Sequence, residues 1–198
     1  HSRQLMPAPD REQIMAIPRE FRIDGQQGVS KPIGLSGGRL EVVTHVVTGL
    51  SAHCQNVIKA ATMAGIKVGQ VVAQPVASGL GASTEQERQL GCVVVDIGAG
   101  TTTIAVFTSG AIAYSAVIPV GSSHVTSDLF KLIKVSPEEA ERLKIVEGRA
   151  SALGLSEEDL VEVVRLGETT ARWMKRRVLC EIIECRMKEI AQFVLQQV

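Results

Sequence analysis

The sequence lacks the marks of a nucleic-acid-binding or membrane-spanning chain. Twenty-one Lys and Arg residues balance 21 Asp and Glu residues, and the longest basic run is only three residues, Lys175–Arg177. Nucleic-acid-binding domains usually carry a basic excess on one face. No apolar run approaches the length of about 20 residues that a membrane-spanning helix needs, and no signal-peptide pattern opens the chain. We therefore expect a cytoplasmic chain with no nucleic-acid partner.

Cysteine and histidine are also too few and too scattered for a zinc site. The sequence has four of each, with no Cys-x-x-Cys pair and no histidine at zinc-finger spacing. Cys180 and Cys185 are five residues apart on a predicted helix, so they point in different directions. Reduced, structural thiols are expected.

The composition does predict a folded core. At 198 residues and 45% hydrophobic, the chain can form one domain or two small ones. It begins with His1 instead of Met, and we expect it to be a piece of a longer protein.

Strand and helix patterns alternate along the chain, which predicts an α/β fold. Strands are expected at Gln13–Asp24 with a kink at Pro18, Arg39–Leu50, Lys67–Pro75, on both sides of residues 98–101, and at Leu160–Leu166. Helices are expected at 52–66 with Ser51 as N-cap, 122–133, 136–148 with Ser136 as N-cap, and about Glu168–Gln197, and a short helix or turn at 76–83. Glycine-rich residues 25–38 and polar residues 84–90 are expected to be connections.

The segment "VVVDIGAGTTTIAVF", Val93–Phe107, raises the question of phosphate binding. A Walker loop would need Gly-Lys-Ser/Thr opening a helix, and a dinucleotide fingerprint would also lead into a helix. Here a second strand follows the glycines. The remaining possibilities are a hairpin with glycines that serve the turn, and a loop whose backbone contacts an anion.

The residue types in this segment are compatible with the second possibility. Gly98 and Gly100 leave no Cβ between the main chain and a ligand. Thr101 and Thr102 add hydroxyl donors, and Asp96 could contact Mg²⁺ through water. The motif alone leaves the two possibilities open.

Several further segments resemble one family. The segment from Val93 resembles the second phosphate loop of the actin and DnaK-type chaperone superfamily. The other matching segments are "IPREFRIDGQQGVSKPIGLSGGRLEVVTHVVTG", "AQPVASGLGAST", "AVIPVGSSHVTSDL", "SPEEAERLKIVEG" and "EIIECRMKEIAQFV". Together, and in this order, they are similar to FtsA, the family of bacterial cell-division actin homologues.

The resemblance implies an α/β, actin-like ATPase (ribonuclease H-like) fold with an inserted small SHS2-type α+β subdomain, present here as a fragment. Residues 3–48 would form part of the inserted subdomain, called 1C. Residues 49–135 would form subdomain 2A with its second phosphate loop, and residues 136–198 would begin subdomain 2B.

The resemblance also implies ATP with Mg²⁺ as cofactors, bound between two lobes. Asp96, Gly98, Ala99, Gly100, Thr101 and Thr102 would face the phosphates, with Asp96 as the Mg²⁺ contact through water. Gln74 would orient water or hydrated Mg²⁺. A neutral amide is a poor general base, so at most a weak ATPase is expected.

As a whole protein, such a family member would polymerise, anchor FtsZ filaments to the inner membrane and recruit later division proteins. It would lie at the division site, peripheral on the cytoplasmic face. The C-terminal amphipathic helix that contacts membrane in the family, the first phosphate loop and the adenosine-binding segment are not found in this sequence.

The sequence departs from the family pattern at four positions. Ala99 replaces a common glycine, Thr103 replaces an acid, and Ser122 and Ser123 stand where Gly-Asp is usual. Ala99 is tolerable if its φ is negative.

Partner contacts are expected in two places. The final helix carries basic residues, among them Arg172, Arg176, Arg186 and Lys188, which form either a solvated face or a site for the acid-containing C-terminal tail of FtsZ. Through subdomain 1C, the loop Gly25–Gly38 is a candidate contact for later division proteins. Two alternatives are a PilM-like scaffold of type IV pilus assembly and a sugar kinase of the same superfamily.

Overall fold

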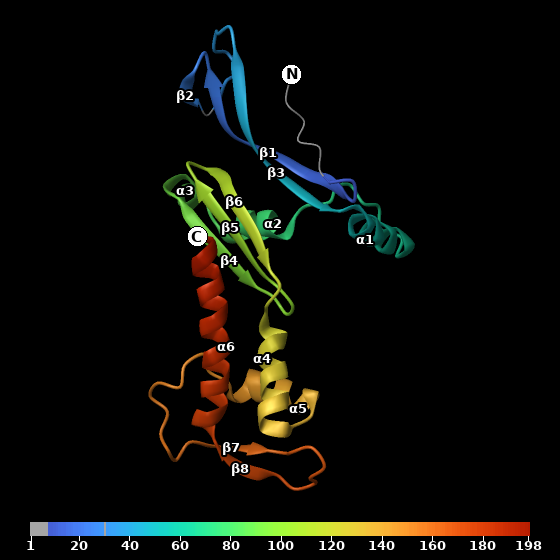
Figure 1. Cartoon of the computed structure of the whole chain (residues 1–198), viewed down its shortest axis with the longest axis vertical. Coiled ribbons are helices and arrows are strands. Elements are labelled where there is room, and N and C mark those ends of the chain that lie inside the picture. The colour runs from blue at the N-terminus through green and yellow to red at the C-terminus, as the bar shows by residue number, and fades with distance from the viewer. Residues whose placement is uncertain (1–7, 30) are drawn as a thin grey trace. The chain divides into compact units, whose positions relative to one another are not determined.

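A computed structural model describes residues 8–29 and 31–198 (Figure 1). Residues 3–7 of the expected inserted subdomain and Ser30 of the expected loop lie outside the described residues. The chain forms two compact units. Unit 1 contains the described residues up to Val94 together with Ile104–Ala116, and unit 2 contains Val95–Thr103 together with Val117–Val198. The expected domain limits at residues 49 and 136 stay predictions.

Unit 1 begins with an antiparallel sheet of order β2-β1-β3, formed by β1 (Arg11–Ile23), β2 (Gln26–Val29) and β3 (Leu40–Leu50). The two strands expected on either side of a kink at Pro18 are one continuous strand, because β1 runs through Pro18, which pairs with Thr44. A register shift follows between Pro18 and Glu20, and a bulge is one of the positions in which a strand accepts proline. The short strand β2 lies inside the segment expected to be a loop.

Helix α1 (Ser51–Met63) follows β3 directly. Ser51 is its first residue and not its N-cap, which is Leu50, so that expectation is wrong. The helix ends as predicted at Gly65, whose φ is +79°. Hydrogen bonds from Gly65 N–H to Thr62 O and from Ile66 N–H to Ala61 O form a Schellman motif there.

Two elements between α1 and the next sheet differ from expectation. Residues 67–73 form no strand, because extended backbone needs a hydrogen-bonded neighbour and the sheets of the described residues provide none for it. Helix α2 (Gln74–Ala82) begins at Gln74, with Pro75 in its first turn. The polar connection contains a helix, α3 (Glu85–Leu90), started by a capping box between Thr84 and Glu87.

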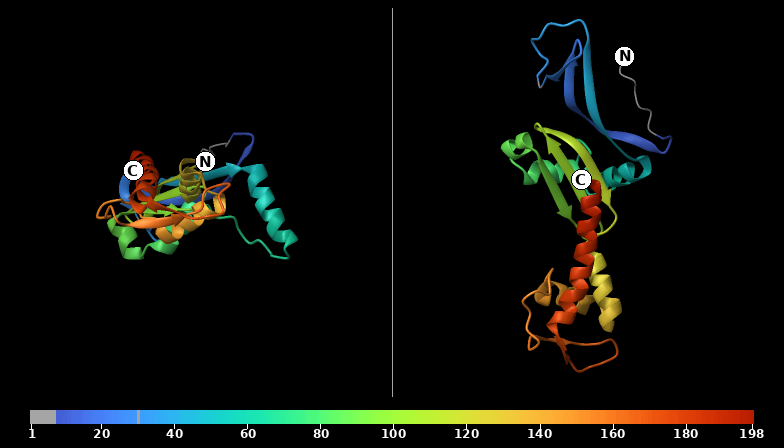
Figure 2. Two further views of the ribbon diagram at one scale, coloured as in Figure 1. Left: turned by 90° about the horizontal axis from the view of Figure 1, so that it is seen from below. Right: turned by 60° about the vertical axis from the view of Figure 1, so that its left-hand side comes forward.

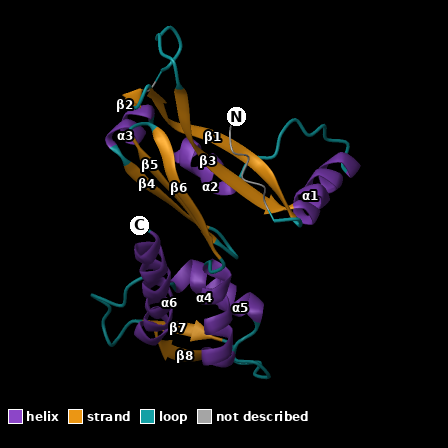
Figure 3. Cartoon of the chain, turned by 45° about the horizontal axis from the view of Figure 1, so that its top comes forward, coloured by secondary structure: helices purple, strands orange, loops and turns teal. Residues whose placement is uncertain are grey.

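A second sheet of order β4-β5-β6 consists of β4 (Cys92–Ile97), β5 (Thr102–Thr108) and β6 (Ala111–Ile118). In unit 1, Val76 of α2 packs against Ala105, Phe107 and Ile112, and β1 adds Met15. Figure 3 shows these strands and helices by type. Gly79 lets α2 approach β5 closely, since a Cβ there would lie 2.7 Å from the Phe107 ring.

Unit 2 is mainly helical. Its elements are α4 (Ser122–Leu129) with a π-helical turn η1 (Phe130–Lys134), α5 (Pro137–Arg142) with η2 (Leu143–Glu147), β7 (Leu160–Val163), β8 (Arg172–Lys175) and α6 (Arg176–Gln197). Ser136 caps α5 as predicted, accepting a bond from Glu139 N–H. Helices α4 and α6 lie side by side in both views (Figures 1 and 2), and Val125, Leu129, Leu179 and Ile183 are part of the core between the elements of this unit.

The last helix was predicted to begin at about Glu168, but α6 begins at Arg176. Residues 172–175 form β8, which pairs with β7 from Val163↔Arg172 to Leu160↔Lys175. Strand β7 in turn ends at Val163 instead of Leu166. The β-branched Thr169 and Thr170 and the glycine at 167 are the sequence features that fit a hairpin better than a helix.

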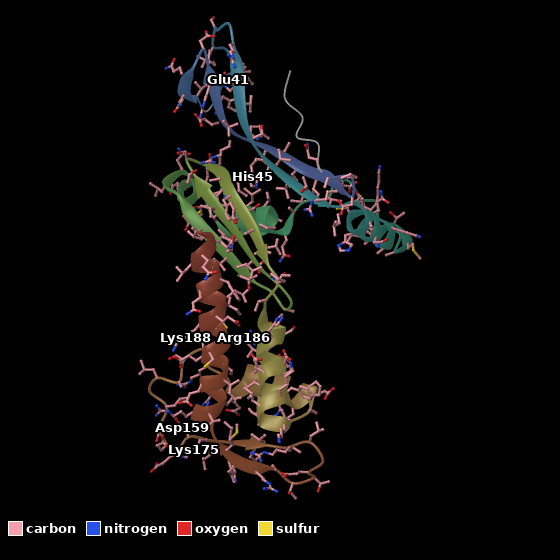
Figure 4. All side chains as sticks on the ribbon, viewed as in Figure 1. Glu41, His45, Asp159, Lys175, Arg186 and Lys188 are labelled. Carbon is pink, nitrogen blue, oxygen red and sulfur yellow. The ribbon has the colours of Figure 1, made fainter. Side chains whose placement is uncertain are left out.

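His45 gives unit 1 a testable pH dependence. Its Nε2 lies 2.9 Å from Ser115 Oγ (His45 is labelled in Figure 4). Burial lowers the pKa of His45, and the charge of Arg19 lowers it further. Because the pKa of His45 is lower in the folded protein, the unfolded chain binds the proton more readily. The contribution of neutral His45 to the free energy of unfolding is therefore present above the unfolded pKa of about 6.5, and it is lost as the pH falls below that value.

Urea unfolding should therefore show that His45→Gln costs more stability at pH 7.5 than at pH 5.5. Equal costs at both pH values would contradict this assignment.

Candidate phosphate-binding loop

The loop Gly98–Thr101 joins two neighbouring strands, β4 and β5, as the sequence predicted. It closes on itself through a hydrogen bond of 2.9 Å from Gly98 N–H to Thr101 O. Ala99 does not have a positive φ, so the condition for tolerating its methyl group is met.

The first turn of α4 holds this loop in place. Ser122 N–H donates to Gly98 O at 2.9 Å, and Ser123 N–H donates to Ala99 O at 2.8 Å. The first N–H groups of a helix have no partner within the helix, and here the loop carbonyls provide it. Ser122 and Ser123, where the family pattern has Gly-Asp, thus contribute backbone groups.

This contact fixes the direction of two further N–H groups. In a planar trans peptide unit, the C=O of one residue and the N–H of the next point to opposite sides. Because Gly98 O and Ala99 O face α4, the N–H groups of Ala99 and Gly100 face away from it. Two consecutive amides on one side of a loop are the arrangement that anion-binding backbone uses.

Gly100 has open space where a side chain would lie. A Cβ built at Gly100 would meet nothing within 4 Å, and its φ is not positive. Neither the space nor the backbone of this chain therefore requires a glycine at position 100. The loop fits a group, such as a phosphate, that approaches the backbone from outside.

Thr102 and Thr103, the first two residues of β5, are both buried. Thr102 is buried, and its hydroxyl donates to Val120 O at 2.8 Å. The predicted contact of Thr102 with a phosphate would therefore have to come from its main chain. Thr103 is buried beside it, and its hydroxyl has no hydrogen-bond partner in the structure. Thr101 is half-buried at the loop itself.

The predicted polar residues Asp96 and Gln74 lie in different units. Asp96 is half-buried in β4, two residues before Gly98, and belongs to unit 2 with the loop. Gln74 opens α2 in unit 1. The described ranges hold no group of three His, Cys, Asp or Glu residues able to bind a metal. Mg²⁺ commonly takes one or two carboxylates and completes its shell with phosphate oxygens and water, so Asp96 fits that more limited role.

The four basic residues of the partner prediction are all ion-paired. Arg172, now on β8, pairs with Glu168, and Arg176 donates to Glu147 O. Lys188 pairs with Glu184 at 2.7 Å, which raises the pKa of its amine. Arg186 makes a bidentate contact with Asp128. The sequence pattern showed the cations but not their partners, which come from other elements in two of these cases.

Gly121 is a site residue that the sequence analysis did not single out. A Cβ at this position would lie 2.5 Å from Gly98 O and 2.6 Å from Ala99 O. Its N–H donates to His124 Nδ1 at 3.2 Å. A glycine directly before a predicted helix, two strands after a glycine loop, was the available signal.

Solved structures with a similar fold are actin-like. MreB 5 of Spiroplasma citri bound to AMPPNP matches with a TM-score of 0.62 and 20% identity, covering 75% of this chain and 47% of that chain. The PilM–PilN type IV pilus biogenesis complex matches with a TM-score of 0.55 and 19% identity, covering 71% and 39%. The fold is thus actin-like, which confirms the predicted α/β, actin-like fold.

Sequence comparisons give the family within that class. A family model described as "Cell division protein FtsA" matches residues 93–196, and one described as "SHS2 domain inserted in FTSA" matches residues 2–48. Cell division protein FtsA of Neisseria meningitidis serogroup B is 42% identical over 187 residues, 94% of this chain and 45% of the relative. FtsA of Escherichia coli K12 is 36% identical over 199 residues, 100% and 47%. The chain belongs to the FtsA family of cell division proteins and spans about half the length of these relatives.

Gly121→Ala tests the contact between loop and helix. The new methyl group would overlap Gly98 O and Ala99 O, and we expect the free energy of unfolding to fall by about 1–3 kcal/mol, the usual cost of overpacking. Urea denaturation measures the change. Gly81→Ala is the matched control, because its Cβ would meet open space and should stabilise helix α2 by up to about 1 kcal/mol. Equal effects of the two substitutions would count against the contact.

Proposed function

We propose that the loop Gly98–Thr101 binds the phosphates of ATP with Mg²⁺, as one side of a nucleotide site. The observation that carries this proposal is the pair of Ala99 and Gly100 N–H groups, which face away from α4, next to a glycine with open space around it. Backbone donors held in advance lose little freedom when an anion binds. The similar fold of the Spiroplasma citri MreB 5 that was solved with AMPPNP bound adds support.

Different groups of the chain would have different roles at such a site. Backbone N–H groups of the loop would hold phosphate oxygens, and Asp96 would contact hydrated Mg²⁺. The bound metal ion would neutralise phosphate charge beside that carboxylate. The expected role of Gln74, which opens α2 in unit 1, stays a prediction; an amide in that role has no useful basicity, so the protein would be at most a weak ATPase.

In the whole protein, we propose an actin-like adaptor for cell division. It would polymerise through actin-like contacts, anchor FtsZ filaments to the inner membrane and recruit later division proteins from the cytoplasmic face at the division site. Among the helices of the described residues, none is long and apolar enough to cross a membrane. Family membership supports a role in cell division.

The inserted subdomain offers a suitable contact for later division proteins. Asp24 closes the base of its loop by accepting bonds from Gly38 N–H at 3.0 Å and Arg39 N–H at 2.7 Å. At the tip, Leu35 N–H donates to Pro32 O in a turn with Gly34 at φ +89°. This turn presents Ile33, which is 96% exposed, and Leu35. Exposed apolar side chains on an ordered turn favour protein contact.

For the acid-containing tail of FtsZ, exposure separates the four basic candidates. The side chains of Arg172 and Lys188 are 65% and 70% exposed, and each has a carboxylate partner close by in sequence. Arg176 and Arg186 are only about a quarter exposed. Exposed pairs contribute little, so an incoming carboxylate can replace their partners. We propose Arg172 and Lys188 as the main tail contacts.

Gly100→Ala tests the nucleotide proposal in the full-length protein. The added methyl group meets no atom of this chain, but it would occupy space that a phosphate needs. We expect affinity for a fluorescent ATP analogue to fall about tenfold or more, from an overlap worth roughly 1–3 kcal/mol. Thermal stability should not change. Gly81→Ala is the control, and unchanged affinity in Gly100→Ala would refute the proposed site.

Arg172→Glu combined with Lys188→Glu tests the tail contact. Losing two surface attractions of up to about 1 kcal/mol each should weaken binding of an FtsZ tail peptide roughly tenfold or more. Fluorescence anisotropy at two salt concentrations measures this. The matched control, Lys59→Glu with Lys67→Glu, makes the same change of net charge in unit 1. If both double variants bind alike, the assigned residues are wrong.

A further inference from the structure

Helix α4 connects the phosphate loop to α6. Its first turn bonds the loop through Ser122 and Ser123, and its other end reaches Asp128. With a rise of about 1.5 Å per residue, Asp128 lies about 9 Å along the axis from Ser122. An axial shift of α4 would therefore carry the loop carbonyls, and the N–H groups opposite them, by the same amount.

Apolar packing holds α4 against α6. Val125 and Leu129 are buried in the core of unit 2 with Leu179 and Ile183 of α6. The apolar attraction is non-directional, so a small axial shift of α4 would weaken it less than it would weaken aligned hydrogen bonds. A directional contact can therefore define the register more sharply.

Asp128 and Arg186 make that directional contact. Arg186 Nε donates to Asp128 Oδ2 at 2.7 Å, and Nη2 donates to Oδ1 at 2.9 Å. A bidentate pair adds geometric specificity because both bonds have to align together. The side chains are 24% and 22% exposed, and Glu189 also pairs with Arg186. Figure 4 labels Arg186 on α6, alongside α4.

A second network ties the same helix to α5 and η2. Thr126 donates to Glu141 Oε2 at 2.6 Å, and Lys144 Nζ donates to Thr126 Oγ1 at 2.9 Å and to Ser122 O at 3.5 Å. None of these bonds involves α6, so the Asp128–Arg186 pair is a separate link between α4 and α6.

We propose that the Asp128–Arg186 pair positions the phosphate loop by fixing the register of α4 on α6. This inference rests on the proposed nucleotide function of the loop. Neither residue contacts the loop, and both act through the helix. Arg186 is thus a positioning residue. Its charge is paired with Asp128, so it is not available to an acidic partner.

Asp128→Asn in the full-length protein tests the proposal, because it keeps the shape and removes the charge. We expect faster hydrogen exchange at the amides of Gly98, Ser122 and Ser123, and affinity for a fluorescent ATP analogue lower by roughly two- to thirtyfold, the range of couplings between connected sites. Asp128→Glu, which keeps the carboxylate, should recover most of both. Arg186→Lys should behave like Asp128→Asn, because lysine cannot make the two-bond contact.

Glu181→Gln is the matched control. It also converts an acid to its amide and breaks an ion pair of α6, with Arg177 at 3.1 Å, but that pair does not involve α4. Its amide exchange and nucleotide affinity should match the unmodified protein. A loss of thermal stability common to both variants, without a difference in loop exchange, would overturn the positioning role.

These experiments distinguish failure of the positioning role from failure of the proposed nucleotide site. If Gly100→Ala weakens nucleotide binding and Asp128→Asn changes neither exchange nor affinity, the positioning role is refuted and the nucleotide site remains. If Gly100→Ala binds nucleotide normally, the proposed function fails and the inference fails with it. Should Asp128→Asn not fold, Arg186→Lys gives the same two readouts.

Discussion

The candidate site depends on one contact, in which the first N–H groups of α4 bond to the carbonyls of Gly98 and Ala99. A helix start needs acceptors, and a glycine loop needs something to limit its freedom. Here the loop carbonyls are the acceptors for the helix N–H groups, and these bonds limit the movement of the loop. The contact explains why position 121 excludes a side chain, and it turns the Ala99 and Gly100 N–H groups away from the helix. Without it, "DIGAGTTT" would be a flexible turn with no preferred face.

The ion pairs change the meaning of the charge pattern on α6. As a sequence, the last 30 residues show repeated Arg and Lys, which suits either a solvated face or an acidic partner. In the structure, Arg176 and Arg186 bond groups on other elements, Glu147 and Asp128. Those two cations stabilise the packing of unit 2 and are poorly placed to recruit a partner. Only exposed pairs close in sequence, such as Lys188 with Glu184, can exchange their partner at low cost.

Local signals in the sequence predicted what local chemistry decides. The Ser136 cap, the end of α1 at Gly65 and the strand–loop–strand geometry at residues 98–101 follow from neighbouring residues, and all three are confirmed. Residues 67–73 and 172–175 were assigned wrongly because strand formation depends on a partner strand, which no local pattern reports. The contact between α4 and the loop could not be predicted either, since its partners, such as Gly98 and Ser122, are 24 positions apart in the sequence.

The glycines discussed here fall into two groups. Gly121 and Gly79 are required by the fold, because a Cβ at either would overlap atoms of this chain. Gly100 is not, because its backbone is unstrained and its surroundings are open. A folding requirement of this chain therefore does not explain Gly100. The proposed approach of a phosphate to the main chain would explain it.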